Sequence, residues 1–274
     1  MRPEFLTDND HRSPQTYSNP TLKIQNPKSL SSLLGLTVVT ILIGMAFISH
    51  QSLWMDEGSG AFKALIPTFR DWWAMTLRIG GSDVQMPVYM FLLWLWHQLG
   101  AVSEYAFRSI NLPWLVISVL ALRRVRFWPL VCLTSPFVMY YVGELRPYAM
   151  QFAAGSLATA AFGRVLTAKK NDYDGLQALC WACLLLTASS LTGVIWAVGI
   201  VVGLCVARTD WLRETRFWRR VLLWVAGAVV MGVYYGFTLL KGYRATGIPG
   251  NGIASVFFGF YEMIGLLGLG PSRN

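Results

Sequence analysis

The chain has 274 residues, of which 54% are apolar, 14% aromatic and 14% charged. The apolar share is above that of an average soluble domain and the charged share well below it, which excludes a soluble enzyme and a disordered chain. The 23 Lys and Arg residues exceed the 14 Asp and Glu residues by 9. They stand in short clusters between apolar runs, as in the loops of a membrane protein, so we expect no nucleic-acid partner.

The N-terminal segment, residues 1–32, is polar and rich in Asn, Ser and Pro. Such a composition cannot bury enough apolar surface to fold alone, and we predict a flexible tail. The first long apolar run, Leu33–Ser49, is about as long as the ~17-residue minimum for a membrane-spanning helix. Because the tail precedes it, this run resembles an anchoring helix more than a cleavable signal peptide.

The next segment, residues 50–105, is expected to form an external loop that carries short interfacial helices. It mixes acidic and basic residues with Trp54, Trp72 and Trp73, as at a membrane boundary. Its apolar stretch, Pro87–Gly100, is too short to cross a bilayer comfortably. We therefore expect an interfacial or re-entrant helix there.

The remaining apolar runs predict an all-α, polytopic membrane protein with about eight transmembrane helices. The longest run, Leu176–Ala207, would exceed the ~30 Å hydrocarbon core as one helix. Ser189, Ser190 and Gly193 favour a turn that splits it in two. The other expected spans are Ala106–Leu122, Phe127–Val142, Tyr148–Leu166, Val221–Leu240 and Ile253–Leu269.

The placement of positive charge predicts the orientation in the membrane. Lys and Arg residues concentrate in cytoplasmic loops. We assume that the N-terminus is cytoplasmic and that Pro87–Gly100 does not cross the membrane. Most of the 23 Lys and Arg residues then lie on the cytoplasmic side. The residues assigned to that side are Arg2, Arg12, Lys23, Lys28, Arg123, Arg124, Arg126, Arg164, Lys169, Lys170, Arg208, Arg213, Arg216, Arg219 and Arg220.

The same orientation gathers four short motifs on the non-cytoplasmic side. Polar groups at one membrane edge, among large apolar surfaces, are what an enzyme acting on a lipid-linked substrate would need. In chain order the motifs are Trp54-Met55-Asp56-Glu57, the stretch from Asp83 to Tyr89, the stretch from Gly100 to Arg108, and Glu144-Leu145-Arg146-Pro147-Tyr148.

This order of motifs resembles the GT-C superfamily of glycosyltransferases, in particular glycosyltransferase family 39 and its bacterial relatives of the protein mannosyltransferase type. The resemblance covers roughly residues 33–166, and a looser fit in hydropathy extends it to a GT-C-like membrane domain over residues 33–274, short at its C-terminus. It implies an integral protein of a bacterial inner membrane that transfers a sugar, with inversion, from a polyprenyl-phosphate donor. The acceptor would be a lipid, a glycan or a protein.

The resemblance also implies roles for single residues. Asp56 and Glu57 match the Asp-Glu pair of the family's first external loop, whose Asp is regarded as the catalytic base, and we assign both as catalytic. Asp83 matches a second acidic element, although Gln85 stands where His is common and Met86 where Pro is common. The candidate substrate-binding residues are Asp83, Arg108, Glu144, Arg146 and Tyr148.

The residues themselves support these roles but leave alternatives open. Sugar transfer from a lipid phosphate needs a base for the acceptor hydroxyl, which suits Asp56, and a cation for the departing phosphate, which suits Arg146. Asp56 could instead only mark the end of a helix. Arg146 could pair with Glu144 or Glu104, and Arg108 could pair with Glu104 one helical turn away.

Two further questions stay open at the level of sequence. Glu57 and Asp83 could steer the acceptor, bind a divalent cation such as Mg²⁺ or Mn²⁺, or pair with Arg78 or Lys63. The whole chain could also be a non-catalytic membrane partner, or a lipid or solute transporter, that keeps only the helical scaffold. Transporters place ionisable residues near the bilayer midplane, whereas the acids here lie at one edge, which favours the enzyme.

Overall fold

The computed structural model describes residues 27–48, 52–169 and 173–241. Within these ranges every regular element is a helix and no strand occurs, which confirms the expected all-α class. The predicted span Ile253–Leu269 and the tail up to residue 26 lie outside the described residues.

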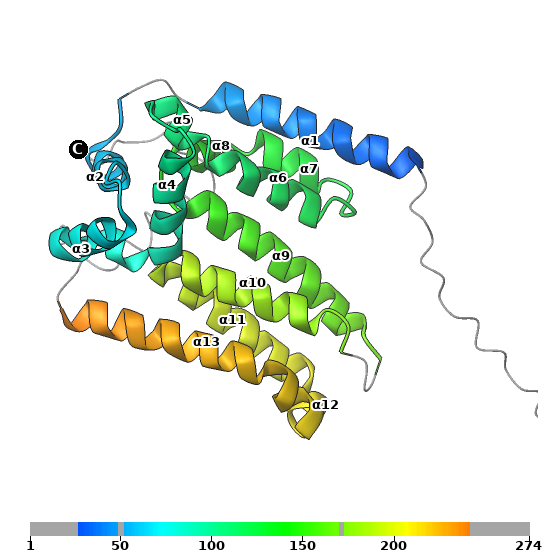
Figure 1. Cartoon of the computed structure of the whole chain (residues 1–274). Helices are drawn as coiled ribbons and strands as arrows, with labels where there is room; N and C mark the ends of the chain where they lie inside the picture. The colour runs from blue at the N-terminus through cyan, green and yellow to red at the C-terminus, as the bar shows by residue number, and fades with distance from the viewer. Residues whose placement is uncertain (1–26, 49–51, 170–172, 242–274) are drawn as a thin grey trace, which may run out of the picture.

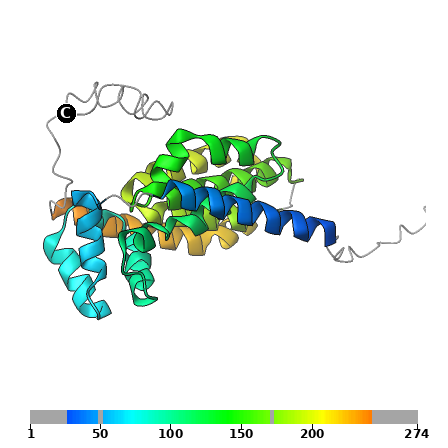
Figure 2. The same cartoon turned by 90° about the horizontal axis from the view of Figure 1, so that it is seen from above.

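Most of the longer helices lie side by side and form the body of the molecule (Figure 1). Shorter helices gather at one end, and the view turned by 90° shows this cyan and teal group beside the body (Figure 2). The body contains α1 (Pro27–Phe47), α6 (Asn111–Ala121), α7 (Trp128–Thr134), α8 (Pro136–Gly143), α9 (Tyr148–Thr167), α10 (Leu176–Ser189), α11 (Leu191–Ala207) and α13 (Thr215–Leu240). One end holds α2 (Met55–Ala64), α3 (Phe69–Ile79), the 3-10 helix η1 (Ser82–Gln85), α4 (Pro87–Gln98) and α5 (Glu104–Arg108), and the other end holds α12 (Thr209–Leu212).

Two helices begin earlier than their apolar runs predict. The first, α1, begins at Pro27, so residues 27–32 belong to a helix and not to the predicted tail. Proline is favoured at a first helical position, where its missing N–H is not needed. The last described helix, α13, begins at Thr215 and not at Val221. The arginines of its first turns lower the hydropathy on which the prediction rested, but arginine does not disfavour a helix.

Two runs expected to form single spans are interrupted. The run Phe127–Val142 is divided between α7 and α8 at Ser135. The Ser135 hydroxyl caps α8, and Pro136 occupies the first helical position. Ala106–Leu122 is divided between α5 and α6. The expectation of one helix in each run was therefore wrong. At Ser135 the reason is that hydropathy alone does not register a capping serine or a proline.

The predicted division of Leu176–Ala207 is confirmed. Helix α10 ends at Ser189 and α11 begins at Leu191, with Ser190 extended between them and its hydroxyl accepting a hydrogen bond from the Gly193 N–H. A Cβ atom on Gly193 would lie 1.9 Å from the carbonyl oxygen of Leu186. The turn therefore requires a residue without a side chain at this position.

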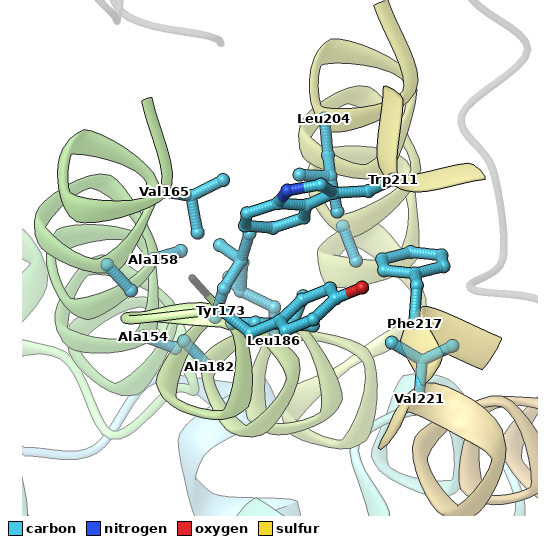
Figure 3. Packing of buried hydrophobic residues seen from close by; sticks show 14 residues of the cluster. Ala154, Ala158, Val165, Tyr173, Ala182, Leu186, Leu204, Trp211, Phe217 and Val221 are labelled. Carbon is cyan, nitrogen blue, oxygen red and sulfur yellow. The ribbon is translucent and has the colours of Figure 1, made fainter. Parts of the chain in front are cut away.

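The interior is built on small side chains. Helix α9 packs between α6 and α10, and its buried face carries Ala153, Ala154, Ala158 and Ala161. Small residues allow helix backbones to approach closely, as is common where helices associate within membranes. Larger side chains, including Trp211, complete this core toward α12 (Figure 3).

The outer surface of the body is strongly apolar. Ile195 and Val206 on α11 and Leu222 on α13 are among the many large apolar side chains exposed there. Among the described helices, Leu30–Phe47 of α1 and Thr215–Leu240 of α13 are long and apolar enough to cross a membrane. Exposed apolar area of this extent indicates contact with another apolar phase, and these two helices point to membrane association.

The short helix α4 takes a different direction from the helices of the body. It crosses one end of the bundle, beside α2, and does not run along it (Figure 1). This helix coincides with most of the Pro87–Gly100 stretch. Its direction is consistent with an interfacial or re-entrant helix, which stays a prediction.

Candidate functional site

Helix α2 presents two sets of side chains at helical spacing. Glu57, Ala61 and Ala64 lie on one face and are buried, while Asp56 and Lys63 follow a second face at an interval of about two turns. The helix therefore contributes both to the core and to a polar cluster with α5, η1 and the turn between α8 and α9.

The Glu57 carboxylate is buried and fully engaged. Its Oε2 atom accepts hydrogen bonds from Arg108 Nη2 at 2.8 Å and from the Trp54 N–H at 3.0 Å, and its Oε1 atom accepts one from the Leu145 N–H at 2.5 Å. Burial raises the pKa of Glu57, but the Arg108 bond and the two N–H bonds outweigh it, so this pKa lies below its ordinary value of 4.5. Glu57 is therefore ionised at neutral pH.

Arg146 forms the centre of the exposed part of the cluster. Its Nη2 atom lies 3.1 Å from Asp56 Oδ2, and its Nη1 atom lies 3.3 Å from Asp83 Oδ1. The Ser82 hydroxyl accepts a further bond from Nη2 at 3.3 Å. The Arg146 side chain is 14% exposed and that of Asp56 75% exposed, so Asp56 forms the side of the pair that is open to a solute.

Asp83 forms the buried side of the same cluster. Its Oδ2 atom accepts bonds from Lys63 Nζ at 2.7 Å and from the Ser59 hydroxyl at 3.1 Å. Lys63, itself buried, also donates to the Gly80 carbonyl oxygen at 3.3 Å. Gly80 and Gly81 have φ values of 68° and 77°, a left-handed backbone that favours glycine and that turns the chain so that Asp83 meets α2.

These contacts show which of the pairings left open by the sequence occur in the structure. Asp83 pairs with Lys63, which was one of the predicted options. Arg108 pairs with Glu57, which was not predicted. Because both members of that pair are buried, their geometry favours a structural role over the catalytic role assigned to Glu57 and the substrate contact assigned to Arg108.

Arg146 likewise has partners that were not predicted for it, namely Asp56 and Asp83. The separation of these residues along the chain explains the miss. A pairing between positions that are not neighbours on one helix leaves no periodic signal in a single sequence.

Glu144 and Tyr148 lie two residues before and after Arg146 in the sequence, at the end of α8 and the start of α9. The Glu144 carbonyl oxygen accepts a hydrogen bond from Asn111 Nδ2 at 2.5 Å, so this part of Glu144 fixes the turn between α8 and α9. Tyr148 is exposed at the start of α9, and its ring lies 4.4 Å from that of Tyr141, centroid to centroid. The substrate contact expected of Tyr148 stays a prediction.

Two residues that shape the site were not among the predicted site residues. Lys63 carries the charge that holds Asp83, and its signal was the helical spacing from Asp56. Asn111 is fully buried and bonds the carbonyl oxygens of Val142 and Glu144. A lone Asn in an apolar run is the signal that could have identified it.

The described residues contain no group of three or more His, Cys, Asp or Glu side chains placed to hold a metal ion. Asp83, the most central carboxylate, is bonded by Lys63, Ser59 and Arg146. Among the described side chains, these cations and donors occupy the oxygens of Asp83.

Comparison of the chain with protein-family models, with curated proteins and with solved structures finds no match. The resemblance to the GT-C superfamily therefore stays a prediction from the four sequence motifs.

Proposed function

We propose that the protein is an inverting membrane glycosyltransferase that uses a polyprenyl-phosphate sugar as donor. The observation that carries the proposal is the pair formed by Arg146 and Asp56. A mostly buried guanidinium is bonded there to an exposed carboxylate, at an end of the helical bundle, next to apolar surface. A phosphate-binding cation and a proton acceptor are the two groups that such a transfer needs.

In the proposed reaction Asp56 accepts the proton of the acceptor hydroxyl. The hydroxyl oxygen forms a bond to the anomeric carbon of the sugar from the face opposite to the phosphate, which inverts the configuration. The bond between this carbon and the phosphate oxygen breaks, and the electron pair leaves with the polyprenyl phosphate. Arg146 stabilises the charge that develops on that phosphate.

The contacts around Arg146 support its role as the phosphate ligand. Asp83 holds one side of the guanidinium, and Lys63 in turn neutralises Asp83. The second side faces Asp56, whose carboxylate is exposed to solvent. A donor phosphate would replace Asp56 at this position and leave the Asp56 carboxylate available as a base.

We propose further that the protein has about eight membrane spans, a cytoplasmic N-terminus and a location in a bacterial inner membrane. The support is the arrangement of charge along the bundle. Helix α2, which carries Asp56, and helix α12, which adjoins several arginines, lie at opposite ends (Figure 1). The donor's apolar tail would lie against the exposed apolar side chains of the body.

The proposal is tested with purified protein in liposomes, a panel of radiolabelled polyprenyl-phosphate sugars, and lipid, glycan and peptide acceptors. We expect labelled product and released polyprenyl phosphate in equal amounts. Arg146→Ala should raise the donor KM, Arg146→Lys should do so less, and Arg78→Ala, which removes an exposed arginine of α3, should leave it unchanged. Assays with Mg²⁺, Mn²⁺ or a chelator decide metal dependence.

Inactivity of the native protein with every donor and acceptor, when the protein is folded, would overturn the proposal. The chain would then be a non-catalytic partner or a transporter, and a flux assay in the same liposomes separates these two.

A further inference from the structure

A second charged surface lies at the end of the bundle that holds α12. It combines the C-terminal part of α9, the turn before α10, and α12 with the first turns of α13 (Figure 1). All of its cationic side chains are exposed. This basic surface consists of Arg164, Lys169, Arg213, Arg216, Arg219 and Arg220.

Arg208 connects the segments that carry the basic surface through hydrogen bonds. It is 8% exposed, and its Nη1 atom donates to the carbonyl oxygens of Val165 at 2.7 Å and of Ala168 at 3.0 Å. Its guanidinium also lies 3.9 Å from the ring centroid of Trp211. Figure 3 shows Val165, Trp211 and Phe217 packed in one cluster beneath this end, so the surface rests on an ordered core.

The carboxylates near the basic surface already have ion-pair or hydrogen-bond partners. Asp210 forms an ion pair with Arg208 at 3.2 Å, and Glu214 accepts a hydrogen bond from the Tyr173 hydroxyl at 2.5 Å. Among the described residues of this region that leaves Asp174, which also has an interaction of its own. The basic surface thus carries more positive charge than the described carboxylates around it can neutralise.

The arrangement of the arginines adds to this excess. Arg216, Arg219 and Arg220 stand at helical spacings of three and four residues on α13, where like charges repel. Arg220 lies over the ring of Tyr173, 5.0 Å from its centroid, and this contact leaves the charge of the guanidinium in place. A bound anion would relieve the repulsion.

Apolar side chains adjoin the basic surface on the same helix. Trp218 is 52% exposed, Leu222 68% and Leu223 71%, and the indole N–H of Trp218 donates to the Leu212 carbonyl oxygen at 3.0 Å. A tryptophan fixed between arginines and exposed leucines is typical of the boundary between lipid headgroups and acyl chains. Helix α13 is also one of the two described helices suited to cross a membrane.

We propose that the basic surface binds the headgroups of anionic phospholipids, through their phosphates, where α13 leaves the bilayer. The cluster of exposed arginines supplies charge complementarity, and the adjoining Trp218, Leu222 and Leu223 supply contact with the acyl chains. This inference does not depend on the transferase activity. It concerns the end of the molecule opposite to Asp56.

The test is a titration of the detergent-solubilised full chain with phosphatidylglycerol or phosphatidylcholine of identical acyl chains, followed by native mass spectrometry. A basic residue near an anionic membrane surface contributes about fivefold to affinity. We expect the native chain to prefer phosphatidylglycerol by roughly tenfold or more. The variant Arg213→Gln, Arg216→Gln, Arg219→Gln should lose this preference, and the same three positions changed to Lys should keep most of it.

A matched control removes the same charge elsewhere, with Arg123→Gln, Arg124→Gln and Arg126→Gln in the exposed turn between α6 and α7. This control should keep the preference for phosphatidylglycerol. Thermal unfolding without lipid verifies that all variants are folded. Equal binding of the two lipids, an equal loss in the control, or displacement of phosphatidylglycerol by inorganic phosphate at the same concentration would each overturn the proposal.

Discussion

The Glu57 carboxylate accepts a hydrogen bond of 2.5 Å from the backbone N–H of Leu145, 88 residues further along the chain. This bond joins the first turn of α2 to the turn between α8 and α9. Asp56 and Arg146 are the sequence neighbours of the two bonded residues, and they form an ion pair of 3.1 Å. Glu57 therefore positions the two groups that the proposed reaction uses, although it is itself buried.

Replacing Glu57 should destabilise the protein strongly. The variant Glu57→Gln loses the charge that compensates Arg108, and breaking a buried ion pair in this way costs about 3–5 kcal/mol. We expect the midpoint of thermal unfolding of the purified protein to fall by roughly 5–15 °C. Glu104→Gln, which alters an exposed carboxylate on α5, is the control and should change stability by less than about 1 kcal/mol.

The same pair predicts how stability depends on pH. The pKa of Glu57 in the folded protein lies below the ordinary value of 4.5. The contribution of ionised Glu57 to the free energy of unfolding is therefore complete above the pKa of Glu57 in the unfolded state. It is lost as the pH falls through the pKa of Glu57 in the folded state. The difference in unfolding midpoint between the native chain and Glu57→Gln should be constant near neutral pH and shrink below pH 4.5. A difference that instead grows on acidification would contradict the assigned ionisation.

Lys63 and Asp83 should be energetically coupled. Each is buried, and the Nζ to Oδ2 distance is 2.7 Å. Lys63→Met leaves a buried carboxylate with one cation fewer, whereas the double variant with Asp83→Asn removes both charges. In a double-mutant cycle we expect a coupling free energy of about 1–3 kcal/mol. Combining Asp83→Asn with Arg78→Met, at an exposed arginine, should give additive effects.

Labelling of introduced cysteines tests the proposed orientation. Arg70 on α3 and Lys169 after α9 are both exposed, and they belong to opposite ends of the bundle in Figure 1. A membrane-impermeant maleimide should label Arg70→Cys from outside intact cells and Lys169→Cys only in inverted vesicles. Labelling of both from the same side would remove the proposed topology.

The sequence predicted those parts of the fold and site that depend on local patterns. The all-α class follows from long apolar runs, and the break at Ser190 follows from two serines and a glycine in a run too long for one span. The break at Pro136 was missed because hydropathy continues across it. The beginning of α13 was missed because its first turns are rich in arginine.

The candidate site was also predictable only where it depends on local sequence patterns. Asp56, Asp83 and Arg146 were recognised as candidates because each stands in a short motif, and the structure brings them together. The pairing of Arg108 with Glu57 could not be predicted, because it joins two distant segments through tertiary packing. Lys63 was predicted only as a possible ion-pair partner, whereas in the structure it is buried and neutralises Asp83.

The central claim is that Asp56 is the proton acceptor in sugar transfer, and the Asp56→Asn variant tests it most directly. The exchange keeps size and hydrogen bonding at an exposed position and removes basicity. The measurement is turnover of a radiolabelled polyprenyl-phosphate sugar by purified protein, compared with Asp71→Asn on the exposed face of α3. We predict that Asp56→Asn lowers turnover by about 10²- to 10⁴-fold with donor binding retained, and that Asp71→Asn is active. Near-native turnover by Asp56→Asn would contradict the account.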